Sequence, residues 1–229
     1  MINIAMKTKG AVDCHSITSI NNFNKAQTQN SQPKPPQNVM RHIPALLCPV
    51  QKGQKISLES GSSLTTINAC FGWNTLNSQC DVDVSAFLLG ADGKVPGDSW
   101  FVFYGQTLSP DHSVQFQQSN TIDCEVIKIN LKQLNINVKK IVFVLTINDA
   151  FEKNLNFGMI NDAYIRILNG NNNNELVSFK MTEYYSNVIS MMIGEIYMHN
   201  GIWKFNAVGN GVARDLAGLC DLYGVQVSN

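Results

Sequence analysis

The sequence predicts an all-β dominated protein, a two-sheet antiparallel β-sandwich with a short C-terminal helix. From Val50 onward, many short strand-like segments alternate with turns, and few stretches have helical spacing. The run IVFVLTI at 141–147 is continuously β-branched and aromatic, which is typical of a strand covered on both faces. Asn200-Gly201 lies between GEIYM and IWKFNAV and favours the left-handed angles of a type I′ turn, which predicts a hairpin.

The remaining elements follow from apolar periodicity. Alternating or apolar runs predict further strands in CDVDVSAFLL (80–89), WFVFYG (100–105), EVIKINL (125–131), AYIRIL (163–168) and ELVSF (175–179). In VARDLAGLCDLYG (212–224) the apolar residues have helical spacing and Gly224 is suited to end the helix.

Residues 1–49 differ in composition from the remainder. The run NNFNKAQTQNSQPKPPQN is rich in Asn, Gln and Pro and cannot bury enough apolar surface to offset its ordering entropy. We therefore expect a disordered or loosely docked extension at 1–49 and a sandwich domain at 50–229. A protein partner of this domain would be recruited through the extension.

Composition and motifs exclude several function classes. The 17 basic and 17 acidic residues balance, so no broad attraction to nucleic acid or anionic membranes is expected. The six cysteines form no CxxC pair, and no segment has the length of a signal peptide core or a membrane span, which predicts a cytoplasmic protein with reduced thiols. Asp111, His112 and Ser113 are consecutive and cannot form a catalytic relay, so no enzyme is predicted.

The segment CDVDVSAF is the first candidate site. In a strand, Asp81, Asp83 and Ser85 point to the same face. Two carboxylates so close together repel each other unless a cation lies between them, and Ca²⁺ takes several oxygen ligands in flexible geometry. The alternative is a solvated strand face.

Two further segments have candidate ligands. Asn120, Asp123 and Glu125 in SNTIDCEV would converge on the first pair if the strands are neighbours, and Asp123 and Glu125, two residues apart, are expected to face the same way. The alternative is an ordinary polar loop. In GNGVARDLAG, Gly209, Gly211 and Arg214 would form an anion site at the start of the helix. The alternative is a tight turn in which Arg214 is paired with a neighbouring acid or exposed.

Several blocks together resemble one family. QKGQKISL, CDVDVSAFLLGADGKV, WFVFYG, VKKIVFVLTINDA, FGMINDAYIRI, GEIYMHNGIWKFNAVGNGVA and LAGLCDLYGV are similar, in this order over about residues 50–227, to the TerD family. The resemblance implies a calcium-binding two-sheet sandwich associated with tellurite resistance and stress responses. It places Asp81 and Asp83 at the family's DLD acids, Asn120 at the Asn of its GDN segment, and Asp123 and Glu125 at the acids of its DDE segment.

The sequence departs from the family in the acidic loop. QSNTIDCE is shorter than the family's Gly-rich loop, and Ser119 and Cys124 stand where acids are usual, which predicts weaker calcium binding. Some amoebal relatives are described as cAMP-binding. Three functions therefore remain open: a calcium-dependent stress-response module, a cAMP-binding protein that uses the Arg214 region, and an interaction scaffold without a small ligand.

Overall fold

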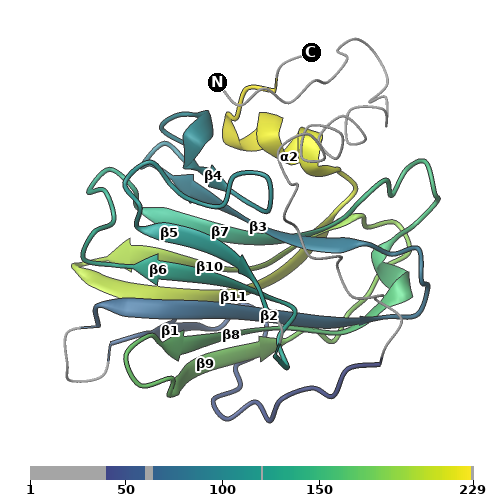
Figure 1. Cartoon of the computed structure of the whole chain (residues 1–229), viewed down its shortest axis with the longest axis horizontal. Coiled ribbons are helices and arrows are strands. Elements are labelled where there is room, and N and C mark those ends of the chain that lie inside the picture. The colour runs from purple at the N-terminus through teal and green to yellow at the C-terminus, as the bar shows by residue number, and fades with distance from the viewer. Residues whose placement is uncertain (1–39, 60–63, 120, 228–229) are drawn as a thin grey trace.

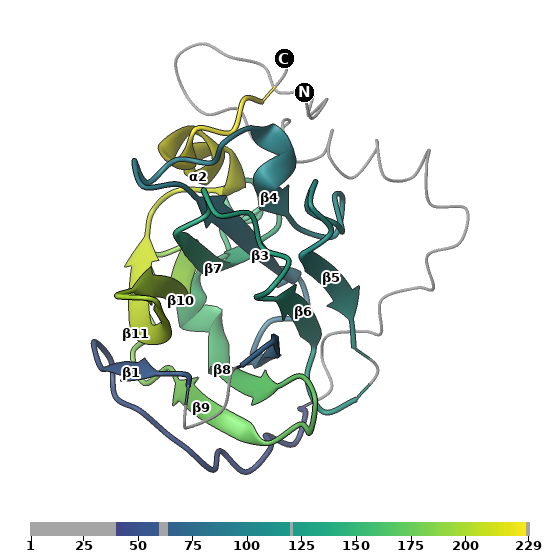
Figure 2. The same cartoon turned by 90° about the vertical axis from the view of Figure 1, so that its left-hand side faces the viewer.

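Two antiparallel sheets lie face to face in the computed structural model of the chain (Figure 1, Figure 2). The structure describes residues 40–59, 64–119 and 121–227. One sheet has six strands in the order β1-β11-β10-β7-β3-β4, and the other has five strands in the order β5-β6-β2-β8-β9. The predicted fold class, a two-sheet β-sandwich with a short C-terminal helix, is confirmed.

The elements have the following bounds. The six-stranded sheet contains β1 (Lys55–Ser57), β3 (Val82–Leu89), β4 (Phe101–Val102), β7 (Lys140–Ile147), β10 (Ser190–His199) and β11 (Ile202–Val212). The five-stranded sheet contains β2 (Thr66–Thr75), β5 (Val114–Gln118), β6 (Glu125–Asn130), β8 (Ile160–Asn169) and β9 (Glu175–Lys180). Two 3-10 turns, η1 (Asp98–Trp100) and η2 (Phe157–Met159), and the helix α2 (Leu216–Tyr223) complete the described elements. The predicted strand at 100–105 is shorter than expected, because only β4 within it pairs with β3.

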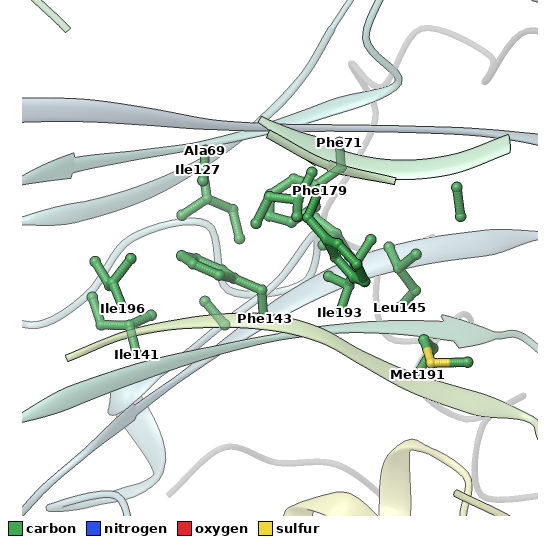
Figure 3. Packing of buried hydrophobic residues seen from close by; sticks show 14 of the residues in the cluster. Ala69, Phe71, Ile127, Ile141, Phe143, Leu145, Phe179, Met191, Ile193 and Ile196 are labelled. Atoms are coloured by element: carbon green, nitrogen blue, oxygen red, sulfur yellow. The ribbon is translucent and has the colours of Figure 1, made fainter. Parts of the chain in front are cut away.

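The core fills the space between the sheets. The rings of Phe71 on β2 and Phe143 on β7 meet across this space, with centroids 5.4 Å apart. Figure 3 shows side chains of both sheets pointing toward one another, among them Ala69, Phe71, Ile127 and Phe179 from one sheet and Ile141, Phe143, Leu145, Met191, Ile193 and Ile196 from the other. Burial of this apolar surface is the main force that holds the two sheets together.

A second apolar cluster lies on the outer face of the six-stranded sheet, beneath α2. Its members include Phe87 of β3, Val144 of β7 and Leu219 of α2. Because β7 contributes alternate residues to both clusters, it is covered on both faces, as its uninterrupted apolar sequence predicts. In the described part of the chain, no helix has both the length and the apolar character that crossing a membrane requires.

The predicted hairpin is confirmed. β10 and β11 pair in antiparallel register up to His199 and Ile202. The two residues between them, Asn200 and Gly201, have φ angles of 52° and 78°. These are the left-handed angles that a type I′ turn requires, and Asn-Gly adopts them readily.

The helix ends where predicted but begins later. Gly224 has a φ of 80° and terminates α2, as expected. The prediction that the helix starts near Val212 is wrong, because Val212 is the last residue of β11 and pairs with Ser190. Asp215 is the N-cap, and its side chain accepts a hydrogen bond of 2.9 Å from the Gly218 N–H.

The described end of the extension contacts the five-stranded sheet. The Arg41 N–H donates to Asn74 Oδ1 at 2.7 Å, and the Asn74 side-chain amide donates back to the Arg41 carbonyl at 3.2 Å. Farther along, the N–H groups of Leu47 and Cys48 both donate to Glu175 Oε1. Residues 40–49 are thus attached to the sandwich mainly through their backbone. Residues 1–39 of the predicted extension lie outside the described residues.

Candidate functional site

Asp81 and Asp83 lie at the start of β3, with Asp83 on the outer face of the six-stranded sheet. Val82 and Val84 point into the core between the sheets. Because side chains alternate along a strand, Asp83 and Ser85 point to the opposite face, where Phe87 belongs to the outer cluster. Both acids are half-buried. The Asp81 carbonyl accepts a hydrogen bond of 2.8 Å from the Asn148 N–H, which joins this end of β3 to the loop after β7.

Glu125 reaches β3 from the opposite sheet. It is the first residue of β6 and is 1% exposed, and it points inward like Ile127 and Ile129 of the same strand. Glu125 Oε2 accepts a hydrogen bond of 2.7 Å from the Val84 N–H. The Glu125 carboxylate therefore contacts the backbone of β3 one residue after Asp83, from the core side, whereas the Asp83 side chain lies on the outer face of the same sheet.

Asp123 has a different environment. Its two carboxylate oxygens accept hydrogen bonds from Arg166, with Nε to Oδ1 at 3.0 Å and Nη2 to Oδ2 at 2.7 Å. The Tyr164 hydroxyl also donates to Oδ1 at 2.9 Å. Arg166 and Tyr164 belong to β8 and face away from the core, so Asp123 lies on the outer face of the five-stranded sheet. The expectation that Asp123 and Glu125 face the same way is wrong.

The side chains of Asp123 and Glu125 lie on opposite faces of the sheet because the regular alternation of β6 does not extend back to Asp123. β6 begins at Glu125, and residues 121–124 form a series of bends. Gly72 of β2, which pairs with Tyr164, leaves room for the tyrosine ring, since a Cβ at this glycine would overlap it. The tyrosine can therefore lie flat across β2 and reach Asp123.

This network perturbs its neighbours electrostatically. Burial, followed by the nearby Asp123 charge, raises the pKa of Cys70 to about 12. The same two causes raise the pKa of the Tyr164 hydroxyl well above its usual range. For Arg166, burial alone would lower the pKa, but the hydrogen bonds and charge of Asp123 outweigh it and raise the pKa. Cys70 and Tyr164 are therefore neutral neighbours of the Asp123–Arg166 pair at neutral pH.

The predicted metal ligands are only partly brought together. No group of three or more His, Cys, Asp or Glu side chains is positioned to hold a metal ion within residues 40–59, 64–119 and 121–227. Glu125 contacts the backbone of β3, whereas Asp123 is engaged by Arg166. Asn120 lies outside the described residues.

The predicted anion site is not assembled at the helix. Gly209 and Gly211 are inside β11, where Gly209 lies against the Phe179 ring and Gly211 against Val188. Arg214 is exposed. The first free N–H groups of α2 face the carboxylate of its own N-cap, Asp215, which occupies the place that an external anion would take.

A small pocket opens beside Asp83 on the outer face of the six-stranded sheet. Its lining combines polar and apolar residues. The polar residues are Asp83, Ser85, Thr146 and Asn148, and the others are Val84, Phe103, Tyr104, Ile147 and Leu216. Two of the polar atoms, Ser85 Oγ and Asn148 Oδ1, are buried and have no hydrogen-bond partner among the described residues. The sequence interpretation placed Ser85 on this face but did not identify Thr146 or Asn148.

A short repeat in the sequence was a missed signal for part of this region. The tetrapeptide INDA occurs at 147–150 and again at 160–163. In both copies the aspartate has a positive φ, 52° and 55°, and forms an ion pair with a lysine. In both copies the asparagine Oδ1 is buried without a partner in the described ranges. The repeat therefore marks the end of β7 and the start of β8, and at each place it buries an asparagine Oδ1.

Comparison with known proteins gives consistent matches. The family model described as the TerD domain matches residues 47–223. The chain is 40% identical to a tellurium resistance protein TerD of Serratia marcescens over 188 residues, 78% of this chain and 98% of that protein. It is 37% identical to general stress protein 16U of Bacillus subtilis (strain 168) over 186 residues, 77% of this chain and 96% of that protein.

A solved structure shows the same fold. The crystal structure of a homologue of telluride resistance protein (TerD) from Streptomyces coelicolor A3(2) matches with a TM-score of 0.51 at 15% identity. The match covers 69% of this chain and 95% of that one. At this level of identity the likeness concerns the fold alone.

Proposed function

The chain belongs to the TerD domain family, and from that premise we propose that it is a non-catalytic stress-response protein that binds calcium through Asp81 and Asp83 at the start of β3. The names of its relatives, tellurium resistance protein and general stress protein, support the stress-response part of the proposal. The geometry at the start of β3 supports the calcium part.

The observation on which the calcium proposal rests is the contact between Glu125 and β3. Glu125 Oε2 accepts a hydrogen bond of 2.7 Å from the Val84 N–H, so a buried carboxylate from one sheet contacts the strand of the other sheet that carries Asp83. Carboxylates that gather in a partly buried place repel one another, and a divalent cation between them removes this repulsion. Calcium suits such a site because its oxygen ligands need not meet a strict geometry.

Asp123 is not part of the proposed ligand set. Both of its oxygens are held by Arg166, and release of that arginine would leave a buried charge unpaired. The site therefore has fewer carboxylates than the five-residue set Asp81, Asp83, Asn120, Asp123 and Glu125 that the sequence predicts. Because calcium affinity increases with the number of charged ligands, we expect weak calcium binding.

A thermal-shift titration of the full chain tests the proposal. Calcium that binds only the folded state stabilises it by about 2.7 kcal/mol when its free concentration is about 100 times the Kd. We expect a saturable rise in Tm with Ca²⁺ and a smaller rise with Mg²⁺, which demands stricter octahedral geometry. Absence of any calcium-dependent rise in Tm at millimolar concentrations would remove the proposal.

Matched variants locate the site. The double variant Asp81→Asn, Asp83→Asn is expected to abolish the calcium-dependent rise in Tm. Asp221→Asn alters an exposed acid on α2 and serves as the control that keeps the rise. Asp123→Asn should also keep it, although its starting Tm is lower, because Asp123 is bonded to Arg166 rather than to the proposed site. A calcium response lost in Asp123→Asn but retained in the double variant contradicts this assignment.

The two alternatives are tested on the same preparation. No contact in the described part of the chain favours the cAMP-binding alternative, since Asp215 occupies the helix terminus that was to hold the phosphate. A saturable rise in Tm with cAMP but not with AMP would restore it. If neither Ca²⁺ nor cAMP changes the Tm, the interaction scaffold becomes the preferred function, because a ligand specific for the folded state must stabilise it.

A further inference from the structure

We propose that the pocket beside Asp83 binds a primary ammonium group carried on a short aliphatic stem. The pocket lies where β3 and β7 pass beneath the first residue of α2, Leu216. It shares Asp83 with the proposed calcium site, but Ser85 and Asn148 also line it, and Glu125 does not. The inference goes beyond the proposed function and does not rest on calcium binding.

The polar side of the pocket offers acceptors that lack donors. Ser85 is only 2% exposed, yet its Oγ has no hydrogen-bond partner among the described residues. Asn148 Oδ1 is also buried and has no hydrogen-bond partner among the described residues. A buried polar atom without a hydrogen-bond partner destabilises the fold, so two such atoms in the lining of one small pocket indicate a missing donor. The Asp83 carboxylate in the same lining favours a donor with positive charge.

A primary ammonium group meets these requirements. It has three N–H donors and no acceptor, so it complements a lining of hydroxyl, amide and carboxylate oxygens. The enclosed space has room for a group of about the size of one water molecule, which matches an ammonium group. A guanidinium group is a wider planar fork and does not fit this space. A calcium ion would require roughly six to eight oxygen ligands, more than this lining provides.

The apolar side of the pocket fits the stem of such a ligand. Phe103, Tyr104 and Leu216 belong to its lining together with the polar side chains. Methylene groups next to an ammonium group pack on surfaces of this kind while the charged end remains with its acceptors. Aromatic faces also attract ammonium groups directly. The same ammonium chemistry occurs in free alkylamines and in lysine side chains, and the experiment distinguishes these two sources.

The test is an NMR titration of the 15N-labelled full chain in calcium-free buffer. The probes are n-butylammonium, for a free amine, and Nα-acetyl-lysine N-methylamide, for a lysine side chain. We expect saturable shifts of the backbone amides of Ser85, Thr146 and Asn148 with at least one probe, and the tighter-binding probe identifies the source. Uncharged n-butanol and tetramethylammonium, which has no N–H donor, should bind at least tenfold more weakly.

Two serine variants provide the matched comparison. Ser85→Ala removes the unpaired hydroxyl and should weaken ammonium binding at least fivefold without loss of folding. Ser178→Ala removes another buried hydroxyl without a partner in the described residues, on the other sheet, and should bind like the original protein. Equal binding of tetramethylammonium and n-butylammonium, unchanged binding in Ser85→Ala, or no saturable shift with either probe overturns the proposal. Because calcium is absent, these outcomes leave the proposed function untouched.

Discussion

Asp123 and Arg166 form a two-armed ion pair that ties the loop before β6 to the middle of β8. The arms are 3.0 and 2.7 Å long, and the side chains are only 6% and 17% exposed. The pair supplies a positive charge to an acid for which the sequence suggested a metal ion. The loop at 121–124 is therefore held by the protein itself at this point.

Loss of the Asp123 charge should destabilise the fold. Asp123→Asn leaves the Arg166 guanidinium partly buried without its counter-charge, and the expected loss is about 3 kcal/mol in the free energy of unfolding. Urea denaturation measures this loss. Glu183→Gln breaks the exposed Lys52–Glu183 pair and should have no measurable effect. Similar losses in the two variants would show that the Asp123 pair is no more important than a surface pair.

Gly72 should not tolerate a side chain. Gly72→Ala places a Cβ where the Tyr164 ring lies, and the required shift of the ring is expected to cost about 2 kcal/mol of unfolding free energy. Gly97→Ala is the control, since its Cβ would come no closer than 3.9 Å to Trp100. In a Tyr164→Ala background the cost of Gly72→Ala should largely disappear. A cost that persists there would mean that the clash is not with the tyrosine.

Asp111 should make stability depend on pH in the acid range. Burial alone would raise the pKa of its carboxyl, but hydrogen bonds from Ser109, Ser113 and the Asn135 N–H outweigh burial and lower it. A lowered pKa in the folded state stabilises above the unfolded value of about 3.9, and this contribution is lost as the pH falls through the folded value. The stability difference between the original protein and Asp111→Asn should thus be constant above about pH 5 and shrink at lower pH. Urea denaturation across this range measures it, and a difference that grows toward low pH would contradict the assignment.

The cysteines should differ strongly in reactivity. Burial raises the pKa of the Cys70 and Cys220 thiols, while Cys48 is exposed. In a Cys14→Ser background, a thiol reagent at about pH 8 should label Cys48 quickly, and Cys48→Ser should remove this fast phase. Labelling of Cys70 in the folded protein at the rate of Cys48 would contradict the buried placement.

Local sequence patterns predicted the strands well where the regular alternation of side chains continues on both sides of a residue. Alternation in EVIKINL predicted β6, and the apolar run at 141–147 predicted a strand covered on both faces. The same alternation failed for Asp123, two residues before Glu125, because the chain bends before β6 begins. A charged residue inside the apolar segment AYIRIL was a usable signal, since a partly buried arginine such as Arg166 requires a counter-charge.

The sequence by itself determined the sandwich, the Asn200-Gly201 hairpin and the end of α2 at Gly224, because each depends on periodicity or on the backbone preferences of one or two adjacent residues. Only the tertiary structure decided which acids meet. Glu125 lies against Val84 and Asp123 against Arg166, and these partners are 41 and 43 residues apart in the chain. Contacts at such separations depend on how the two sheets stack and on where each strand begins, and local periodicity predicts neither of these.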